Sequence, residues 1–137
     1  MAAGSPRMPW WRRWFGSRSE RAAARYLRRA GLRVLARNVT TPHGEIDLVA
    51  LHDGCVVFVE VRSTAGEDAS RPAESVDREK QRRLTDAALD FLRRRNLLGY
   101  PARFDVLAMS WPEGRREPSI EHFAHAFEAV GRGQMFS

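Results

Sequence analysis

The stretch GEIDLVALHDGCVVFVEVR, residues 44–62, decides the fold of this chain. Its two halves, 45–51 and 55–62, are rich in valine, leucine and isoleucine. The dipeptide Asp53-Gly54 lies between them, and such a dipeptide between strand-like runs is a strong β-hairpin signal. The sequence therefore predicts two antiparallel strands joined by a two-residue turn.

The register of this hairpin brings two acids together. If Asp53-Gly54 forms the turn, His52 pairs with Cys55, and counting outward places Asp47 opposite Glu60. Facing carboxylates repel, and burial raises the cost. The pair therefore requires a proton, a basic side chain or a hard cation such as magnesium, which prefers oxygen ligands. A plain ion cluster with arginines stays open as the alternative, and a separate cross-strand salt bridge is expected between Glu45 and Arg62.

The flanking sequence predicts helices around this hairpin. Residues 18–30 have helical spacing, and Ser17 with Glu20 forms an S-x-x-E capping box before them. A second helix is predicted over 76–95, and the segment 63–74 before it is predicted to be a loop. Further strands are expected at 32–39, 103–109 and 120–123. The predicted class is α/β, with a mixed β-sheet flanked by helices in the order α-β-β-β-α-β-β, because a helix between strands implies a parallel crossover.

One lysine stands out among the basic residues. Of the 23 lysines and arginines, 22 are arginines and only Lys80 is lysine. Lysine is a compact ammonium group that can change its protonation on burial, which arginine does not do. Lys80 lies four residues before Leu84 on the apolar side of the predicted helix, so we expect it to face the sheet. Retention by chance is the alternative.

The basic charge is concentrated near the N-terminus. Residues 1–38 carry ten arginines and one acid, whereas residues 39–137 carry 13 basic and 16 acidic residues. This asymmetry indicates a polyanionic partner, with nucleic acid first and an anionic membrane second, or else an arginine-rich surface in solvent. The first helix supplies the nucleic-acid-binding candidates Arg18, Arg21, Arg25, Arg28 and Arg29.

The length and composition predict one domain with two short ends. We expect a flexible extension rich in arginine and tryptophan at 1–16, an α/β domain at 17–127 and a tail at 128–137. A single cysteine excludes an internal disulfide. No apolar run is long enough to span a membrane, and a cytoplasmic location is expected. The four histidines and Asp105 are interpreted as structural.

The motifs resemble those of a small bacterial family, the YraN-like proteins. The resemblance covers about residues 17–127 and its most specific part is Gly-Glu-Ile-Asp-Leu at 44–48 followed by Phe-Val-Glu-Val-Arg at 58–62. That family looks like a branch of the PD-(D/E)xK nuclease superfamily, near archaeal Holliday-junction resolvases. The resemblance implies a restriction-endonuclease-like fold and a phosphodiester hydrolase that uses a divalent metal.

The resemblance also implies roles for individual residues. Asp47 matches the metal-binding aspartate, and Glu60 matches the glutamate of the E-x-K element. The backbone carbonyl of Val61 is the third expected ligand to magnesium or manganese. Glu20 matches a glutamate of the first helix that often joins the site.

The chain departs from the superfamily pattern at one position. The lysine of E-x-K is replaced by Arg62, whose guanidinium keeps its proton but can bind a phosphate. In this superfamily the lysine can migrate to the following helix, where Lys80 lies. The catalytic set implied is therefore Glu20, Asp47, Glu60, Arg62 and Lys80.

The expected function is a magnesium-dependent endonuclease acting on DNA. Two alternatives stay open. The chain could be a nucleic-acid-binding module that keeps the nuclease fold without catalysis, or an adaptor whose tryptophan-rich N-terminal segment binds a protein or a membrane. Junction resolvases of this fold act as dimers, so the resemblance also implies a homodimer.

Overall fold

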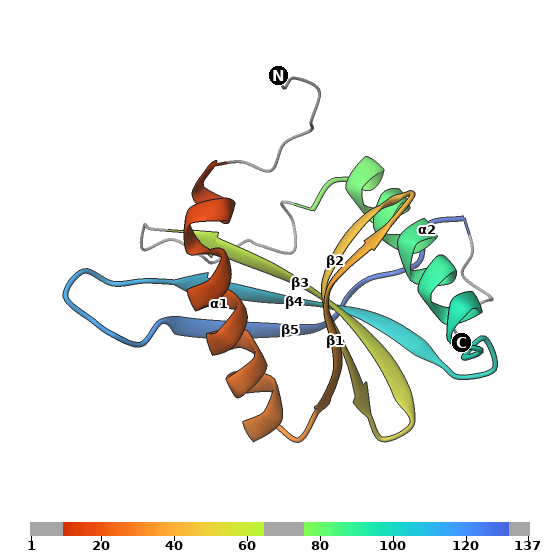
Figure 1. The fold of residues 1–137 in the computed structure, drawn as a ribbon, viewed down its shortest axis with the longest axis horizontal. Coiled ribbons are helices and arrows are strands. Elements are labelled where there is room, and N and C mark those ends of the chain that lie inside the picture. Colours follow the sequence, from red (N-terminus) through yellow and green to blue (C-terminus); the bar gives the residue numbers. More distant parts are fainter. Residues whose placement is uncertain (1–9, 65–75, 132–137) are drawn as a thin grey trace.

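The computed structural model describes residues 10–64 and 76–131. Two helices and five strands follow one another in the predicted order α-β-β-β-α-β-β (Figure 1). Their bounds are α1 Trp10–Arg29, β1 Arg33–Thr41, β2 Gly44–His52, β3 Cys55–Thr64, α2 Arg78–Arg94, β4 Ala102–Ser110 and β5 Ser119–Phe127. The predicted loop over 63–74 is therefore shorter at its start, and residues 65–75 lie outside the described part.

The five strands form one mixed sheet in the order β1-β2-β3-β4-β5. All neighbours pair antiparallel except β3 and β4, which are parallel and are joined through α2. This is the predicted crossover. The helices lie on opposite faces of the sheet (Figure 1). The predicted α/β, restriction-endonuclease-like architecture is confirmed.

The central hairpin has the predicted turn. Asp53 and Gly54 both have positive φ angles, 51° and 79°, as a type I′ turn requires. His52 pairs with Cys55, and the predicted register continues outward as far as Leu48 with Val59. Regular pairing of β2 and β3 stops there, one residue before the two predicted acids.

The first helix is longer than predicted. It begins at Trp10, so Ser17 lies inside the helix and the predicted capping box is wrong. The cluster of tryptophans and arginines supports helix rather than ending it, because none of these residues is a helix breaker. At the other end Gly31 has a φ of 95°, and Leu32 N–H donates to the Leu27 carbonyl at 2.9 Å, as expected for a glycine stop.

Helix α1 extends into the expected extension at 1–16, while residues 1–9 and 132–137 lie outside the described part.

The last strand, β5, is longer than the predicted 120–123. Its apolar residues do not alternate regularly, and its pairing with β4 includes a register shift and a positive φ at His125, features that depend on the neighbouring strand.

Two apolar cores lie on the two faces of the sheet. The core beneath α1 contains Leu27, Val59 and Leu107, among others, and the core beneath α2 contains Phe58 and Phe91. Each helix thus covers side chains that alternate along the central strands. The candidate site lies at the margin of the second core.

The alternation breaks near the end of the central hairpin. Leu48 belongs to the core beneath α1, whereas Ile46, two residues away, belongs to the core beneath α2. Asn38, on the neighbouring β1, has a φ of 49°, in the left-handed region. The end of the β1–β2 hairpin therefore turns from one face of the sheet toward the other, with Asp47 at the change.

Candidate functional site

Glu60 is the centre of the candidate site. It lies on β3 and its side chain is 3% exposed. The Nζ of Lys80 is 3.1 Å from Glu60 Oε2, and Nη1 of Arg62 is 3.4 Å from the same oxygen. Lys80 and Arg62 are 29% and 25% exposed, so each base connects the buried carboxylate with the surface. A buried charge requires such partners, and here both come from predicted site residues.

The beginning of α2 places Lys80 beside Glu60. Asp77 is the N-cap, and its Oδ1 accepts a hydrogen bond of 2.9 Å from the backbone N–H of Lys80. Leu84, one turn later on the same side, is buried in the core beneath α2. The predicted inward orientation of Lys80 is therefore confirmed.

Asp47 joins the site through the backbone. Its Oδ2 accepts a hydrogen bond of 2.8 Å from the N–H of Val61. A carboxylate thus bonds to the backbone next to Glu60, beyond the last regular pair of β2 with β3. The structure brings Asp47, Glu60 and Val61 together, but not by the continued ladder that the sequence suggested.

Glu20 lies on α1, which covers the opposite face of the sheet from α2. Its Oε2 is 3.9 Å from Nη1 of Arg37 on β1, and Arg37 pairs with Leu48. Within residues 10–64 and 76–131, Glu20 reaches neither of the two central acids. The predicted Glu45–Arg62 salt bridge is wrong: Arg62 pairs with Glu60 on its own strand instead.

The donor set suits a hard divalent cation that keeps water ligands. Asp47 and Glu60 offer carboxylate oxygens. Val61, the residue after Glu60 on β3, offers the oxygen of its backbone carbonyl. In the described ranges no three His, Cys, Asp or Glu side chains are grouped to hold a metal. Magnesium is commonly held by one or two carboxylates plus water and substrate phosphate, so two carboxylates fit this mode and would not fit a closed protein cage.

The five predicted nucleic-acid-binding arginines are all exposed on α1. The guanidinium of Arg18 lies 4.1 Å from the centre of the Trp111 ring, and Arg25 approaches Glu117 at 4.0 Å. The remaining three are Arg21, Arg28 and Arg29. The helix thus presents a basic outer face to solvent, as the sequence predicts.

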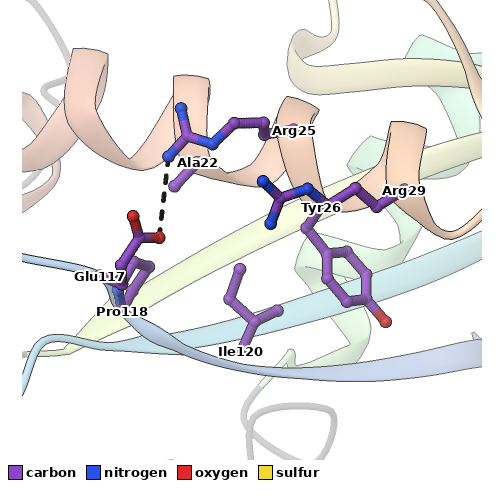
Figure 2. A pocket seen from close by; sticks show the side chains of 7 residues that line it. All are labelled: Ala22, Arg25, Tyr26, Arg29, Glu117, Pro118 and Ile120. Atoms are coloured by element: carbon purple, nitrogen blue, oxygen red, sulfur yellow. Dashed lines mark ion pairs between the residues drawn. The ribbon is translucent and has the colours of Figure 1, made fainter.

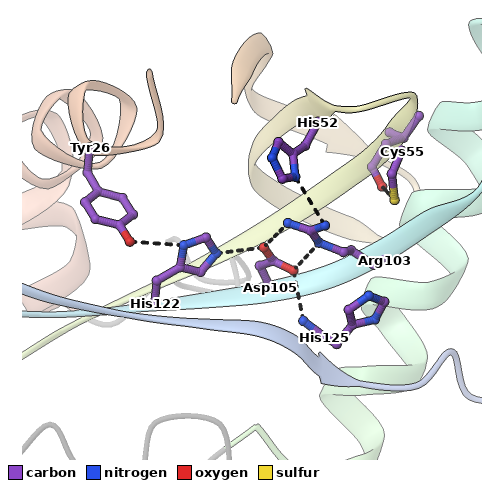
Figure 3. A network of polar contacts seen from close by, with 8 residues as sticks. Tyr26, His52, Cys55, Arg103, Asp105, His122 and His125 are labelled. Carbon is purple, nitrogen blue, oxygen red and sulfur yellow. Dashed lines mark hydrogen bonds and ion pairs between the residues drawn. The ribbon is translucent and has the colours of Figure 1, made fainter. Parts of the chain in front are cut away.

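The second buried carboxylate is Asp105, and its hydrogen bonds agree with the structural role predicted for it. Asp105 on β4 is 0% exposed and accepts hydrogen bonds from Arg103 at 3.0 and 3.2 Å and from His122 Nε2 at 2.7 Å (Figure 3). The backbone N–H of His125 adds a bond of 3.1 Å. The hydroxyl of Tyr26 on α1 lies 3.1 Å from Nδ1 of His122. The network therefore ties α1 to the sheet.

The electrostatics of this network favour an ionised Asp105. Burial raises the pKa of Asp105, but hydrogen bonds from His122, Arg103 and the backbone lower it by a larger amount. The pKa of Asp105 therefore lies below its ordinary value. The hydrogen bond to Asp105 raises the pKa of Arg103. Burial, with the Asp105 charge, raises the pKa of Tyr26.

The chemistry of Asp105 also determines the histidine tautomer. A carboxylate can only accept, so His122 Nε2 carries a proton. In the neutral ring Nδ1 then accepts the Tyr26 O–H. The spacing of Arg103 and Asp105 on one strand face was a usable signal in the sequence. The links to Tyr26 and His122 were not, because they join distant segments.

Comparison with known proteins gives the chain its family. The model of a family described as "Uncharacterised protein family UPF0102" matches residues 19–109, which include the whole hairpin and Lys80. The chain belongs to the uncharacterised protein family UPF0102.

UPF0102 relatives are similar over most of this chain. A UPF0102 protein of Rhodopirellula baltica is 47% identical over 85% of this chain and 71% of its own length. One from Roseiflexus castenholzii is 46% identical over 82% and 92%, and one from Syntrophotalea carbinolica is 42% identical over 85% and 93%. Among the helices described for this UPF0102 chain, none is sufficiently long and apolar to cross a membrane.

Proposed function

We propose that this UPF0102 protein is a phosphodiester hydrolase that acts on DNA with magnesium or manganese. The observation that carries the proposal is the contact of Lys80 Nζ with Glu60 Oε2 at 3.1 Å. The sequence contains one lysine, and it reaches the one buried glutamate of the central hairpin. The resemblance to nucleases whose lysine moves to the following helix gives this contact its meaning.

The proposal assigns separate tasks to the residues of the site. Asp47, Glu60 and the Val61 carbonyl would hold the ion, which when bound supplies Lewis-acid polarisation of the phosphate and a more acidic water. Lys80 holds Glu60 in place and donates hydrogen bonds toward the attacking water or the phosphate. Arg62 binds the phosphate oxygens, where negative charge grows in the transition state.

The remaining parts of the proposal concern binding. The exposed arginines of α1 would contact the DNA backbone, so affinity should fall steeply with salt. Glu20 would act from the margin of the site through water or a second ion, since its direct partner is Arg37. A homodimer and a cytoplasmic location belong to the same proposal.

One observation favours a second candidate, a nucleic-acid-binding module without catalysis. Lys80 and Arg62 both contact Glu60, and two cations can neutralise a buried carboxylate without a metal ion. This candidate keeps the fold and the basic face of α1. It predicts DNA binding that does not depend on magnesium, and no cleavage.

The first experiment measures cleavage of branched, flapped and linear DNA with magnesium, with manganese and with chelator. We expect wild type to cleave in the presence of metal, and Asp47→Asn to lose about 100-fold or more in rate. Asp53→Asn is the matched control, since it makes the same chemical change in an exposed turn. Equal rates for wild type and Asp47→Asn would reject the catalytic assignment.

A calorimetric titration separates the two candidates. Magnesium or manganese is added to wild type and to Glu60→Gln, with Glu79→Gln, an exposed site on α2, as control. A hydrolase site predicts a binding isotherm for wild type and Glu79→Gln that is lost in Glu60→Gln. The same weak signal in all three proteins would favour the binding module.

A further inference from the structure

A cavity lies between α1 and the start of β5, away from Glu60. Its volume is about 280 Å³, at the small end of ligand pockets. Figure 2 shows Arg25 and Arg29 extending from α1 above Ile120, with the Tyr26 ring on one side and Glu117 on the other. The cavity lies on the α1 face of the sheet, whereas Lys80 approaches Glu60 from α2.

The two halves of the cavity differ in chemistry. Its floor is apolar, formed by the ring of Tyr26 and the side chain of Ile120, with Ala22 and Pro118 beside them. Two guanidinium groups one helical turn apart form the other half. A ligand that fills this cavity therefore needs a flat or apolar part next to a group of negative charge.

We propose that this cavity binds one nucleotide of a nucleic acid, with the phosphate on Arg25 and Arg29 and the base against Tyr26 and Ile120. The proposal rests on the proposed function for the class of ligand, and it adds a subsite on the opposite side of the sheet from the hydrolytic site. Arginine forks match phosphate oxygens, and bases stack on aromatic rings irrespective of sequence. The volume suits one nucleotide rather than a duplex.

The charges of the cavity favour an anion despite the acid at its rim. Within the described ranges Arg29 has no acidic partner. The Arg25–Glu117 contact is 4.0 Å long between side chains that are 49% and 75% exposed, so exchanging Glu117 for a phosphate costs little. The C-terminal end of α1 carries about half a negative charge, which two guanidinium charges outweigh.

The buried network beneath the cavity fixes its floor. The Tyr26 hydroxyl is bonded to His122, which is bonded in turn to the buried Asp105 (Figure 3). The Tyr26 and His122 rings meet edge to face with centres 5.5 Å apart. Tyr26 thus presents its ring in one orientation before any ligand arrives, which lowers the entropic cost of binding.

The test measures binding of deoxyadenosine 5′-monophosphate by calorimetry at low salt, without metal. Arg29→Gln is compared with Arg33→Gln, which removes the same charge from an exposed position four residues further along the chain but does not line the cavity. We expect Arg29→Gln to weaken binding about tenfold or more, and Arg33→Gln by less than about twofold. Equal losses would overturn the proposal, because they would indicate attraction by net charge alone.

A ligand series tests the floor. Deoxyribose 5-phosphate carries the phosphate but lacks the base, so we expect it to bind about fivefold or more weakly than the nucleotide. Equal affinity would overturn the placement of the base against Tyr26.

A gain of affinity provides a test that loss of folding cannot imitate. Glu117→Gln removes the acid that competes for Arg25, so we expect tighter nucleotide binding, whereas Glu113→Gln, outside the cavity lining, should bind less tightly than Glu117→Gln. Equal effects of the two changes would contradict the proposal.

The two proposals can fail separately. Asp47→Asn should retain nucleotide binding in the cavity even where cleavage is lost. Cleavage without nucleotide binding would remove the subsite and leave the hydrolase, and nucleotide binding without cleavage would do the reverse.

Discussion

Two buried carboxylates, Glu60 and Asp105, lie on adjacent strands of this sheet and are held in different ways. Asp105 is fully enclosed and has a two-bond contact with Arg103, a short bond to His122 and a backbone donor. The bases on Glu60 approach a single oxygen at 3.1 and 3.4 Å and are themselves partly exposed.

On the proposed function, this difference separates a structural role from a binding role. The bonds to Asp105 join β4 and β5, with α1 linked through His122, and their geometry suits the stabilisation of a buried charge. The bases of Glu60 reach solvent, so they can exchange partners with a phosphate without unfolding the core. If the proposed function holds, burial of an acid does not by itself mark a functional site, whereas the accessibility of its partners does.

The largest expected effect is on stability. Asp105→Asn leaves the guanidinium of Arg103 without its carboxylate in the interior, and we expect a loss of about 3–5 kcal/mol in the free energy of unfolding. Glu60→Gln should cost about 1 kcal/mol, because Lys80 and Arg62 can turn to water. Urea unfolding of both variants gives the comparison, and equal losses would remove the distinction between the two carboxylates.

The next effect concerns the lysine on α2. We expect Lys80→Ala to reduce metal-dependent DNA cleavage about 100-fold while the free energy of unfolding changes little. Lys80→Arg should recover part of the loss if the role is charge alone. Arg82→Ala, exposed on the same helix, is the control, and an equal loss for Arg82→Ala would assign the effect to DNA attraction.

A smaller effect follows from the lowered pKa of Asp105. Its folded pKa lies below the ordinary value of 3.8, so the ionised form contributes stability that is present above the unfolded pKa. That contribution is lost as the pH falls through the folded pKa. Unfolding free energies measured from neutral to acidic pH should therefore fall less steeply in Asp105→Asn than in wild type. Parallel curves for the two proteins would contradict this assignment.

The smallest expected effect is that of the Tyr26 hydroxyl. Tyr26→Phe keeps the ring but removes the bond to His122, and we expect a loss of about 1 kcal/mol in unfolding free energy. Thermal unfolding measures this loss of stability, and Tyr100→Phe, a change at an exposed tyrosine, is the control. No change in Tyr26→Phe would show that the hydroxyl bond does not help to hold α1 on the sheet.

Local signals in the sequence were sufficient for the fold. Asp53-Gly54 set the hairpin and its register, and a helix before β4 implied the parallel crossover. The orientation of Lys80 was also predictable, because its spacing from Leu84 fixes the direction of the side chain once the helix is predicted.

Contacts between distant segments were not predictable in the same way. The break in pairing at Asp47 lies beside Asn38 of β1, whose left-handed backbone no periodicity predicts. The bonds among Tyr26, Asp105 and His122 depend on where α1 and β5 lie relative to β4. The start of α1 was not predictable from the capping pattern, because Ser17 and Glu20 lie inside a longer helix.

The delivery of Lys80 from α2 makes the chemistry of the site depend on the docking of that helix. Glu60 comes from β3, and the ammonium group reaches it only once the helix has docked against the sheet. A newly made chain with its hairpin paired and its helix still undocked would carry the acids and Arg62 without the lysine. On the proposed function, such an unfinished molecule would be inert toward the genome around it.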